Sequence, residues 1–445
     1  MGKDSKRRRA VYVNCDGLGA NWVSPDATPH LSALRGYSLA ASDHRAIFPS
    51  VTRPSAASVA TGCWPQRHGL HGNRVALLEG ERLVVRDVGL PDFRDHLRRA
   101  TGATLRVPTL AQRVRASGGF VAFSNVSPGA AYFLDPDHHG FVYHRAGSFA
   151  PGGASIVGAG HLGVSHDLAG DVAMTERFCD EVVLQGSASV AVLWLANPDL
   201  TLHSTPLGSP EHLEALRIAD ECVGRVLASV AAARSGTDDI LLLVGSDHGQ
   251  ETIGEGVSIE AWLRDHDCTE ELVSGRMAVA AQGTSALLYA LPDARAKLAG
   301  LLPSMSAEAW ARSVVAGSDL EARCRVAGGH LVAAVDMGSD GGSNPFRVAG
   351  RRFVCTDGEK PARSGCGQHG GLGADETHPF LLLNHPSIMP GATSRTTSLV
   401  DIAPSILAFL GLPGDDLDGR SILDQAPGLP TSEIAAQVAH PSDPT

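Results

Sequence analysis

Short apolar runs alternate along the chain with longer segments of helical periodicity. The apolar runs are short and bounded by glycine or polar residues, as buried strands are, and they cover residues 10–15, 120–124, 190–195, 240–244 and 380–383. Between these runs, the spacing of apolar positions predicts helices at 30–34, 54–61, 167–183, 210–230 and 399–410. This alternation predicts an α/β fold, an α/β/α sandwich with a mostly parallel central sheet.

Two longer stretches fit this alternation poorly. Residues 77–160 are rich in glycine, proline and charge, and residues 254–363 carry mixed short strands and helices. We interpret both as cap-like insertions that cover one edge of the sheet within a single domain over residues 10–426. The proline- and serine-rich residues 427–445 are expected to form a mobile tail.

Composition and charge narrow the class of protein. Hydrophobic residues make up 43% of the 445 residues and charged residues 19%, which supports a sizeable core and excludes a disordered chain. The formal net charge of −11 disfavours a nucleic-acid polymer as partner. No apolar run approaches the ~20 residues of a membrane span, and the basic N-terminus lacks the apolar region of a signal peptide. With eight scattered cysteines and no CxxC pair, we expect a soluble cytoplasmic protein.

Carboxylate and imidazole side chains follow shortly after three of the predicted strands. These residues are Asp16, Asp199 and the adjacent pair Asp247 and His248. In open α/β sheets, ligands bind outside the carboxyl ends of the strands, so these side chains should meet at one edge. Carboxylates crowded at that edge would repel one another unless cations neutralised them.

Two further histidines extend this set to six protein ligands. His203 lies four residues after Asp199, and His369 lies among glycines that allow close backbone approach. One tetrahedral zinc seldom uses more than four ligands, so two ions fit the count better, with manganese or iron as alternatives to zinc. His378 is the main alternative to His369, and residues 135–139 offer ligand types for a separate metal site.

A hydroxyl and an amide complete the predicted site. Thr52 is expected at or just before a helix N-terminus, whose partial positive charge favours an alkoxide and a bound phosphate. A threonine hydroxyl needs activation by a base or a metal to act as a nucleophile. Asn73 could donate a hydrogen bond to a phosphoryl oxygen. Each residue alone has an ordinary role, such as a helix cap or a turn, but the joint pattern favours catalysis.

The ordered set of motifs resembles the alkaline phosphatase superfamily, and most of all its nucleotide pyrophosphatase/phosphodiesterase branch, which includes phosphonoacetate hydrolase. The resemblance spans residues 11 to about 371. Its motifs are Val-Asn-Cys-Asp-Gly at Asp16, Phe-Pro-Ser-Val-Thr-Arg-Pro-Ser at Thr52, His-Gly-Asn at Asn73, Pro-Asp with the later His203, Ser-Asp-His-Gly at Asp247 and Gln-His-Gly-Gly at His369. It implies an alkaline phosphatase-like sandwich with inserted cap-like segments.

The resemblance also implies a two-zinc site with a threonine nucleophile. One ion would be held by Asp16, Thr52, Asp247 and His248. The other would be held by Asp199, His203 and His369. Thr52 would form a phosphothreonine intermediate, and Asn73 would stabilise a non-bridging oxygen. The expected function is hydrolysis of phosphodiester or pyrophosphate bonds in a small phosphorylated substrate.

Two alternative functions stay open. One is cleavage of the carbon–phosphorus bond of phosphonoacetate, whose hydrolases hold the substrate carboxylate with lysines. This chain has lysines only at positions 3, 6, 297 and 360, so Arg106 or Arg145 would have to substitute. The other is a metal-binding scaffold without catalysis. His161 and His166 are candidates to line the cleft, and Trp64, Tyr132 and Phe133 are candidates to stack on a leaving group. The oligomeric state stays open, with a dimer as one option.

Overall fold

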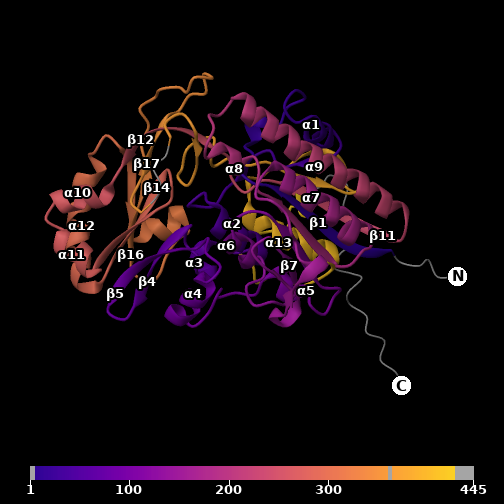
Figure 1. Cartoon of the computed structure of the whole chain (residues 1–445), viewed down its shortest axis with the longest axis horizontal. Coiled ribbons are helices and arrows are strands. Elements are labelled where there is room, and N and C mark those ends of the chain that lie inside the picture. The colour runs from indigo at the N-terminus through magenta and orange to yellow at the C-terminus, as the bar shows by residue number, and fades with distance from the viewer. Residues whose placement is uncertain (1–5, 359–362, 426–445) are drawn as a thin grey trace.

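A ten-stranded sheet is the larger of the two main sheets, in the strand order β20-β2-β19-β11-β1-β10-β6-β7-β8-β9. It lies at one end of the molecule, on the right in Figure 1, where β1 and β11 are labelled. The structure is a computed structural model that describes residues 6–358 and 363–425, so the predicted tail at 427–445 lies outside the described residues. The middle of the sheet is parallel and consists of β11 (Asp238–Gly245), β1 (Arg7–Cys15), β10 (Val190–Leu195) and β6 (Phe120–Ser124). This arrangement confirms the predicted α/β fold with a mostly parallel central sheet.

Short strands complete both edges of this sheet. Beyond β6 lie β7 (Phe141–Tyr143), which is parallel to it, and the antiparallel β8 (Ser148–Phe149) and β9 (Ser155–Ile156). Beyond β11 lie β19 (Leu381–Asn384), β2 (Leu39–Ala40) and β20 (Gly391–Ala392), of which β19 runs antiparallel to both neighbours. Part of the stretch 77–160 therefore contributes strands to the central sheet.

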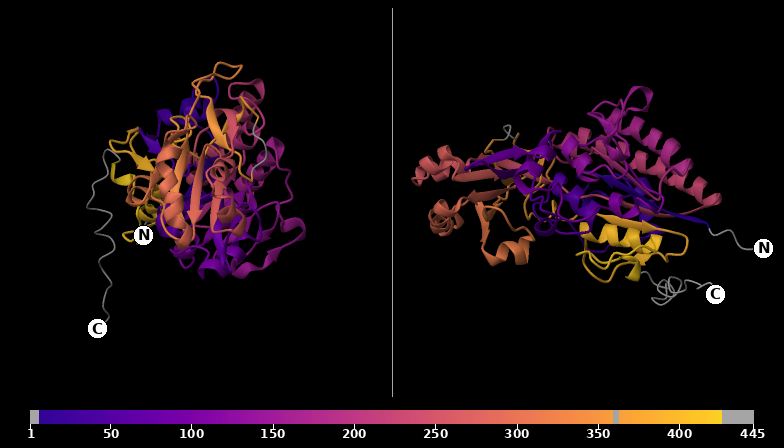
Figure 2. Two further views of the ribbon diagram at one scale, coloured as in Figure 1. Left: turned by 90° about the vertical axis from the view of Figure 1, so that its left-hand side faces the viewer. Right: turned by 90° about the horizontal axis from the view of Figure 1, so that it is seen from below.

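Helices cover both faces of the sheet, and the alternation of side chains along β1 shows how. Ala10 and Tyr12 point into one apolar core, whereas Val11 and Val13 point into the other. The first core is closed by α2 (Thr52–Thr61), α5 (Leu110–Val114), α6 (Pro128–Phe133) and α13 (Ile402–Leu410). The second is closed by α1 (Pro29–Gly36), α7 (Leu168–Phe178) and α9 (Pro210–Ser235), on the opposite side (Figure 2). Burial on both faces explains why the parallel strands are continuously apolar.

A second, smaller sheet occupies the other end of the molecule (Figure 1). Its antiparallel strands are β13 (Met277–Ala281), β14 (Ser285–Ala290), β16 (Leu331–Met337) and β15 (Ala311–Ala316). One face packs with α10 (Ile259–Asp265), α11 (Thr269–Ser274) and α12 (Pro292–Ser306), and the other with the hairpin of β4 (Arg74–Glu79) and β5 (Arg82–Asp87). Most of the stretch 254–363 thus builds this sheet.

Several smaller elements lie outside these two sheets. A three-stranded ribbon is formed by β17 (Arg352–Cys355), β12 (Glu251–Val257) and β18 (Gly367–Gln368). Other strands and α-helices are β3 (His44–Arg45), β21 (Thr397–Ser398), α3 (Pro65–His68), α4 (Phe93–Thr101) and α8 (Asp199–Leu202). No helix in the described ranges combines the length and the apolar character needed to cross a membrane.

The structure shifts several predicted boundaries. The helix predicted over 54–61 begins at Thr52, because Pro54 fits the first turn, where its missing N–H has no partner to lose. The segment 167–183 divides into α7 and a π-helical turn, Cys179–Leu184. The helix predicted over 399–410 starts with a 3₁₀ turn, Leu399–Asp401, before α13.

Candidate active site

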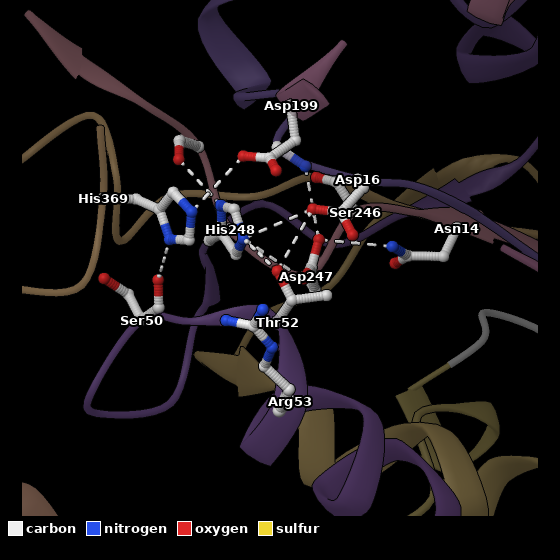
Figure 3. A network of polar contacts seen from close by, with 12 residues as sticks. Asn14, Asp16, Ser50, Thr52, Arg53, Asp199, Ser246, Asp247, His248 and His369 are labelled. Carbon is white, nitrogen blue, oxygen red and sulfur yellow. Dashed lines mark hydrogen bonds and ion pairs between the residues drawn. The ribbon is translucent and has the colours of Figure 1, made fainter. Parts of the chain in front are cut away.

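Three carboxylates meet where neighbouring strands of the central sheet end (Figure 3). Asp16 follows β1, Asp199 opens α8 after β10, and Asp247 follows β11. The backbone N–H of Asp199 donates to the carbonyl of Asp16 at 3.1 Å, which ties two of these strand ends together. Asp16 and Asp247 are buried, with 1% and 0% of their surface exposed, so their charges are removed from water.

His248 lies at the centre of the first group of ligand atoms. Its Nε2 atom is 3.4 Å from Asp16 Oδ1 and 3.3 Å from Asp247 Oδ2. Thr52 Oγ1 lies 3.3 Å from the same Nε2 atom and 3.5 Å from Asp16 Oδ1. The ligand atoms of Asp16, Asp247 and His248 all lie within 4.8 Å of one another. The predicted nucleophile therefore adjoins a group of three metal-ligand side chains.

A second group of ligand atoms surrounds Asp199. Its Oδ1 atom lies 3.3 Å from His369 Nε2, and its Oδ2 atom lies 3.2 Å from His203 Nε2. The rings of His369 and His248 stack with centroids 3.6 Å apart, and Asp199, His248 and His369 form a group within 4.8 Å. His248 thus lies in both groups, while His203 stands at the outer side of Asp199 with 37% of its side chain exposed.

Buried hydrogen bonds orient the carboxylates of the first group. Trp194 Nε1–H donates to Asp16 Oδ2 at 2.9 Å, and Asn14 Nδ2–H donates to Asp247 Oδ1 at 3.2 Å. Tyr12 in turn donates its hydroxyl to Asn14 Oδ1 at 2.7 Å. Partners of this kind fix the direction of a ligand oxygen. Sequence reasoning missed these residues, although the one polar side chain inside the run 10–15, Asn14, was a signal.

Ser50 joins the loop before Thr52 to the loop that carries His369. The carbonyl of Ser50 lies 2.7 Å from His369 Nδ1, a contact that orients the ring so that Nε2 faces Asp199. The Ser50 hydroxyl donates to the carbonyl of Gly371 at 2.9 Å and accepts from the N–H of Gly370 at 3.0 Å. Gly370 has φ +127°, a conformation that glycine adopts readily.

The electrostatics of the first group call for a cation. Burial, and then the charges of Asp247 and Asp199, raise the pKa of Asp16 well above its usual value. Burial also raises the pKa of Asp247 to about 7. Within the described part of the chain, Asp247 Oδ2 accepts no hydrogen bond, although His248 Nε2 lies 3.3 Å away. A buried carboxylate oxygen without a donor, beside two further ligand groups, fits a divalent metal ion.

The second group behaves as an ion pair in the protein alone. Burial opposes ionisation of Asp199, but the charges of His203 and His369 lower its pKa well below the usual value. Burial likewise opposes the charge on His369, but Asp199 raises the pKa of that ring overall. A metal ion bound here would take the place of the proton on the imidazole, so metal binding should release protons.

A cavity of about 660 Å³ opens in front of Thr52. Asn73 lines it, and its side-chain oxygen accepts from the N–H of Arg53 at 3.1 Å in the first turn of α2. The amide nitrogen of the same side chain is then left to donate to a ligand. Arg53 Nε–H donates to Ser127 Oγ at 3.1 Å, and Arg363 also lines the cavity. The sequence had suggested Arg53 as a possible clamp on the phosphate, whereas it had given Arg363 no role.

The alternative ligand His378 and the alternative metal segment 135–139 both lie away from the cavity. His378 does not line the cavity; its Nδ1 atom contacts the carbonyl of Ala374, and 39% of its side chain is exposed. In the segment 135–139, both carboxylate oxygens of Asp135 accept from backbone N–H groups at 3.0 and 2.7 Å and so close a turn. Among the residues that the structure describes, this segment contributes no group of three metal-ligand side chains.

The other residues suggested for substrate contact are also mostly displaced. Arg145 donates to the backbone carbonyls of Asn125 and Val126, each at 2.7 Å, and neither it nor Arg106 lines the cavity. The other candidates carry imidazole or aromatic rings. His166 lines the cavity and His161 does not; Tyr132 and Phe133 are buried in apolar clusters, and Trp64 lines a different cavity.

Comparison with known families identifies the chain. The sequence profile of the family described as type I phosphodiesterase / nucleotide pyrophosphatase matches residues 10–319. The chain belongs to this family. Type I phosphodiesterases are metal-dependent hydrolases of the alkaline phosphatase superfamily, so the resemblance inferred from the motifs is confirmed.

The curated relatives of the chain come from the same superfamily but match only in part. The 2,3-bisphosphoglycerate-independent phosphoglycerate mutase of Prochlorococcus marinus (strain MIT 9303) is 30% identical over 201 residues, which are 41% of this chain and 36% of that protein. The mutase of Parasynechococcus marenigrum (strain WH8102) is 33% identical over 84 residues, 19% of this chain and 14% of that protein. The chain thus matches about a third of the length of the first mutase and a smaller part of the second.

Solved structures establish the fold over nearly the whole chain. Murine ectonucleotide pyrophosphatase / phosphodiesterase 5, solved as an inactive threonine-to-alanine variant with AMP, has a TM-score of 0.67 at 16% identity and covers 94% of this chain and 100% of its own. Phosphonoacetate hydrolase from Sinorhizobium meliloti 1021, solved with phosphonoformate, has a TM-score of 0.65 at 15% identity and covers 91% and 96%. The chain therefore has the alkaline phosphatase-like architecture.

Proposed function

We propose that this protein hydrolyses phosphodiester or pyrophosphate bonds in a small phosphorylated substrate, with Thr52 as the nucleophile. The observation that carries the proposal is the place of Thr52 Oγ1, 3.3 Å from His248 Nε2 and facing the cavity. The two groups of ligand side chains share that histidine. Family membership and the inactive threonine variant of the murine relative support this assignment.

Two metal ions fit the donor set, and we propose zinc, with manganese or iron as alternatives. The first ion would be held by Asp16, Thr52, Asp247 and His248. The second would be held by Asp199, His203 and His369. Carboxylate oxygens and imidazole nitrogens are the ligands that zinc prefers, and seven side chains exceed the four of one tetrahedral ion. When bound, such a pair supplies Lewis-acid stabilisation of the phosphoryl oxygens and an activated water.

The residues of the chain carry the two transfer steps. Thr52 Oγ1 attacks phosphorus from the N-terminus of α2, whose partial positive charge favours the alkoxide. The new bond from Oγ1 to phosphorus forms as the bond to the leaving oxygen breaks. Water then attacks phosphorus, breaks the bond to Oγ1 and restores the threonine. Asn73 donates its amide N–H to a non-bridging oxygen during both steps.

Phosphonoacetate is a second candidate substrate, favoured by the similarity to phosphonoacetate hydrolase and by two arginines at the cavity. Arg53 and Arg363 line the cavity, where a guanidinium could hold a substrate carboxylate in place of a lysine. Arg106 and Arg145 stand outside it and cannot take that role. A diester has no such carboxylate, so the two candidates differ in what these arginines must bind.

A comparison of two Thr52 variants tests the proposed function. The zinc-loaded enzyme should hydrolyse an aryl phosphodiester, and chelation should abolish turnover until zinc is restored. Thr52→Ala should lower kcat by at least about 1,000-fold, while Thr52→Ser, which keeps a hydroxyl, should retain far more activity. Near-normal turnover by Thr52→Ala would remove the nucleophile assignment. Release of acetate and phosphate from phosphonoacetate, with diesters left intact, would favour the second candidate.

The setting of the enzyme follows from its composition and is also a proposal. All eight cysteines are free and buried, which suits the reducing cytoplasm. The net charge of −11 supports a small substrate rather than a nucleic-acid polymer. We retain a single catalytic domain over residues 10–426, and the oligomeric state stays open.

A further inference from the structure

A second cavity, of about 530 Å³, is lined by arginine side chains far in excess of its carboxylates. Its arginines are Arg45, Arg323, Arg325, Arg395 and Arg420. Its only lining carboxylates among the described residues are Asp401 and Asp418. Five cations against two anions give the lining residues a formal charge of +3 in a chain whose net charge is −11. Arg45 is paired with Asp43, which lies outside the lining, at 2.6 Å, so the excess of positive charge rests on the other arginines. The net charge of the whole chain is negative, so a cavity lined mainly by positive charge stands out from the rest of the surface.

Both carboxylates of the wall are already occupied by the protein. Asp418 accepts from Arg67, which lies outside the cavity, at 2.9 Å and from the N–H of Trp64 at 2.9 Å. Asp401 accepts from Arg395 at 2.9 Å and from two backbone N–H groups, those of Ser398 and Arg420, at 3.0 and 2.7 Å. Neither group has capacity to neutralise the other arginines of the cavity.

Two of the arginines are left without a carboxylate partner within the described ranges. Arg420 and Arg325 have no carboxylate oxygen within 4.0 Å there, and Arg323 has only Asp319 at 3.9 Å. The guanidinium of Arg325 lies over the ring of Trp64, 6.0 Å from its centroid. These side chains are exposed, so water and free anions can reach them.

The backbone at Arg325 fixes the position of its side chain. Arg325 has φ +55°, in the left-handed region that glycine or asparagine adopts at lower cost. Its carbonyl accepts from the N–H of Gln66 at 2.8 Å, which fixes the residue against α3. Arg325 ends the π-helical turn Leu320–Cys324, where a left-handed residue is a common helix end, and this ending holds its side chain beside Trp64.

We propose that this cavity is a second binding site, separate from the active site, for a compact polyanion with at least three negative charges, such as a polyphosphate chain. Guanidinium groups bind phosphate oxygens through paired N–H donors, and the cavity volume is that of a small-molecule site. The acidic remainder of the protein would repel a long polyanion, so the occupant should be small.

Calorimetry with matched variants tests the proposal on the zinc-loaded enzyme. The probe is a tripolyphosphate analogue with methylene bridges, which cannot be hydrolysed at the bridges. Arg323→Ala/Arg420→Ala removes two exposed guanidiniums from the cavity and leaves the active site intact. Arg217→Ala/Arg264→Ala removes two exposed guanidiniums that lie on α9 and α10 and gives the same change in net charge. Binding of the probe at the active site contributes equally to the titration of each variant, so a difference in affinity between the cavity variant and the control variant reports on the arginine-lined cavity.

The cavity variant should bind the probe about 10- to 100-fold more weakly than the wild type, while the control pair stays within about twofold. Arg323→Lys/Arg420→Lys should fall between them, because it keeps the charge and loses the paired donors. It also carries the test if the alanine variant does not fold. Equal affinity of the cavity and control variants would overturn the proposal. If the arginine dependence holds, a nucleoside triphosphate analogue that binds tenfold more tightly identifies a nucleotide as the occupant, and equal affinity identifies the bare chain.

Discussion

The two ends of strands β1 and β11 bury charge in different ways. At the amino ends, Arg9 is fully buried and its Nη1 lies 2.7 Å from Asp238 Oδ2. Arg9 also donates to the carbonyls of Val182, Val183 and Ala188 at 2.7 to 2.9 Å. At the carboxyl ends, the same strands lead to Asp16 and Asp247, and the described residues place no lysine or arginine within 4.0 Å of either carboxylate.

The pKa values follow this difference. Burial opposes ionisation of Asp238, but Arg9 and Arg7 lower its pKa below the usual value. Burial raises the pKa of Asp247 to about 7, because no arginine compensates it. A buried ion pair that is complete within the chain is a structural element, whereas a buried set of anions without a cation is incomplete on its own. The contrast points to the carboxyl ends as the place for a cation, without any reference to a relative.

The largest expected effect is on turnover. Asp247→Asn removes a carboxylate from the first ligand group, and we expect kcat for an aryl phosphodiester to fall by at least about 1,000-fold, or about 4 kcal/mol. Steady-state kinetics at saturating zinc measure this. Asp238→Asn, the same change at the other end of β11, should keep activity within about threefold at temperatures where it stays folded. Equal losses of turnover in both variants would contradict the claim that only the carboxyl ends of the strands take part in catalysis.

Part of this organisation could be predicted from the sequence. The runs 120–124 and 190–195 match β6 and β10 because a parallel strand buried on both faces has to be apolar from end to end. The carboxylates after such strands could be placed at one edge, since parallel strands share a direction. The smaller sheet could not be predicted. Its antiparallel strands lie within residues 277–337, and they are buried by helices and by a hairpin that is distant in the sequence, so the local pattern does not show what they pack against.

The supporting contacts of the site could not be predicted for a similar reason. The hydrogen bond from Trp194 to Asp16 joins residues 178 positions apart, and that between Ser50 and His369 joins residues 319 apart. Nothing in the local pattern distinguishes Trp194 from an ordinary core residue. Arg145 was a reasonable candidate for the cavity by charge, but it binds backbone carbonyls, and Arg53 lines the cavity instead.

The next effect concerns the complete ion pair. Arg9→Met leaves Asp238 and three backbone carbonyls without their buried donor, and we expect the free energy of unfolding to fall by about 3–5 kcal/mol. Arg8→Met is the control, because 53% of its side chain is exposed and its nearest carboxylate is 4.0 Å away; it should change stability by less than about 0.5 kcal/mol. Denaturant unfolding with and without chelator should give the same loss for Arg9→Met. A loss that depends on zinc would show that the two ends are not independent.

A smaller effect appears when the metal is removed. In chelated protein at pH 8, Asp247→Asn should raise the free energy of unfolding by about 1–3 kcal/mol, because it removes a buried charge with an unpartnered oxygen. The folded-state pKa of about 7 lies above the usual value of an aspartate, so ionisation destabilises the fold; the penalty is complete above pH 7 and declines as pH falls from 7 toward the usual aspartate range. The advantage of the variant over the wild type should therefore shrink between pH 8 and pH 5.5, measured by denaturant titration. If the difference in stability between the variant and the wild type grew toward acid pH, the raised pKa of Asp247 would be contradicted.

The smallest effect tests whether the surrounding fold prepares the second ligand group. Ser50→Ala removes the hydroxyl that holds Gly370 and Gly371, while the carbonyl that contacts His369 Nδ1 remains. Partners behind a metal ligand commonly contribute 10- to 100-fold to affinity, and with the carbonyl retained we expect zinc to bind about 10-fold more weakly. Competition with a chromogenic chelator measures this, and Ser235→Ala, an exposed serine at the end of α9, should leave affinity unchanged. If Ser50→Ala lowers thermal stability but not zinc affinity, the loop contact supports the fold and not the metal site, and the carboxyl end of the sheet is then prepared by its strand ends alone.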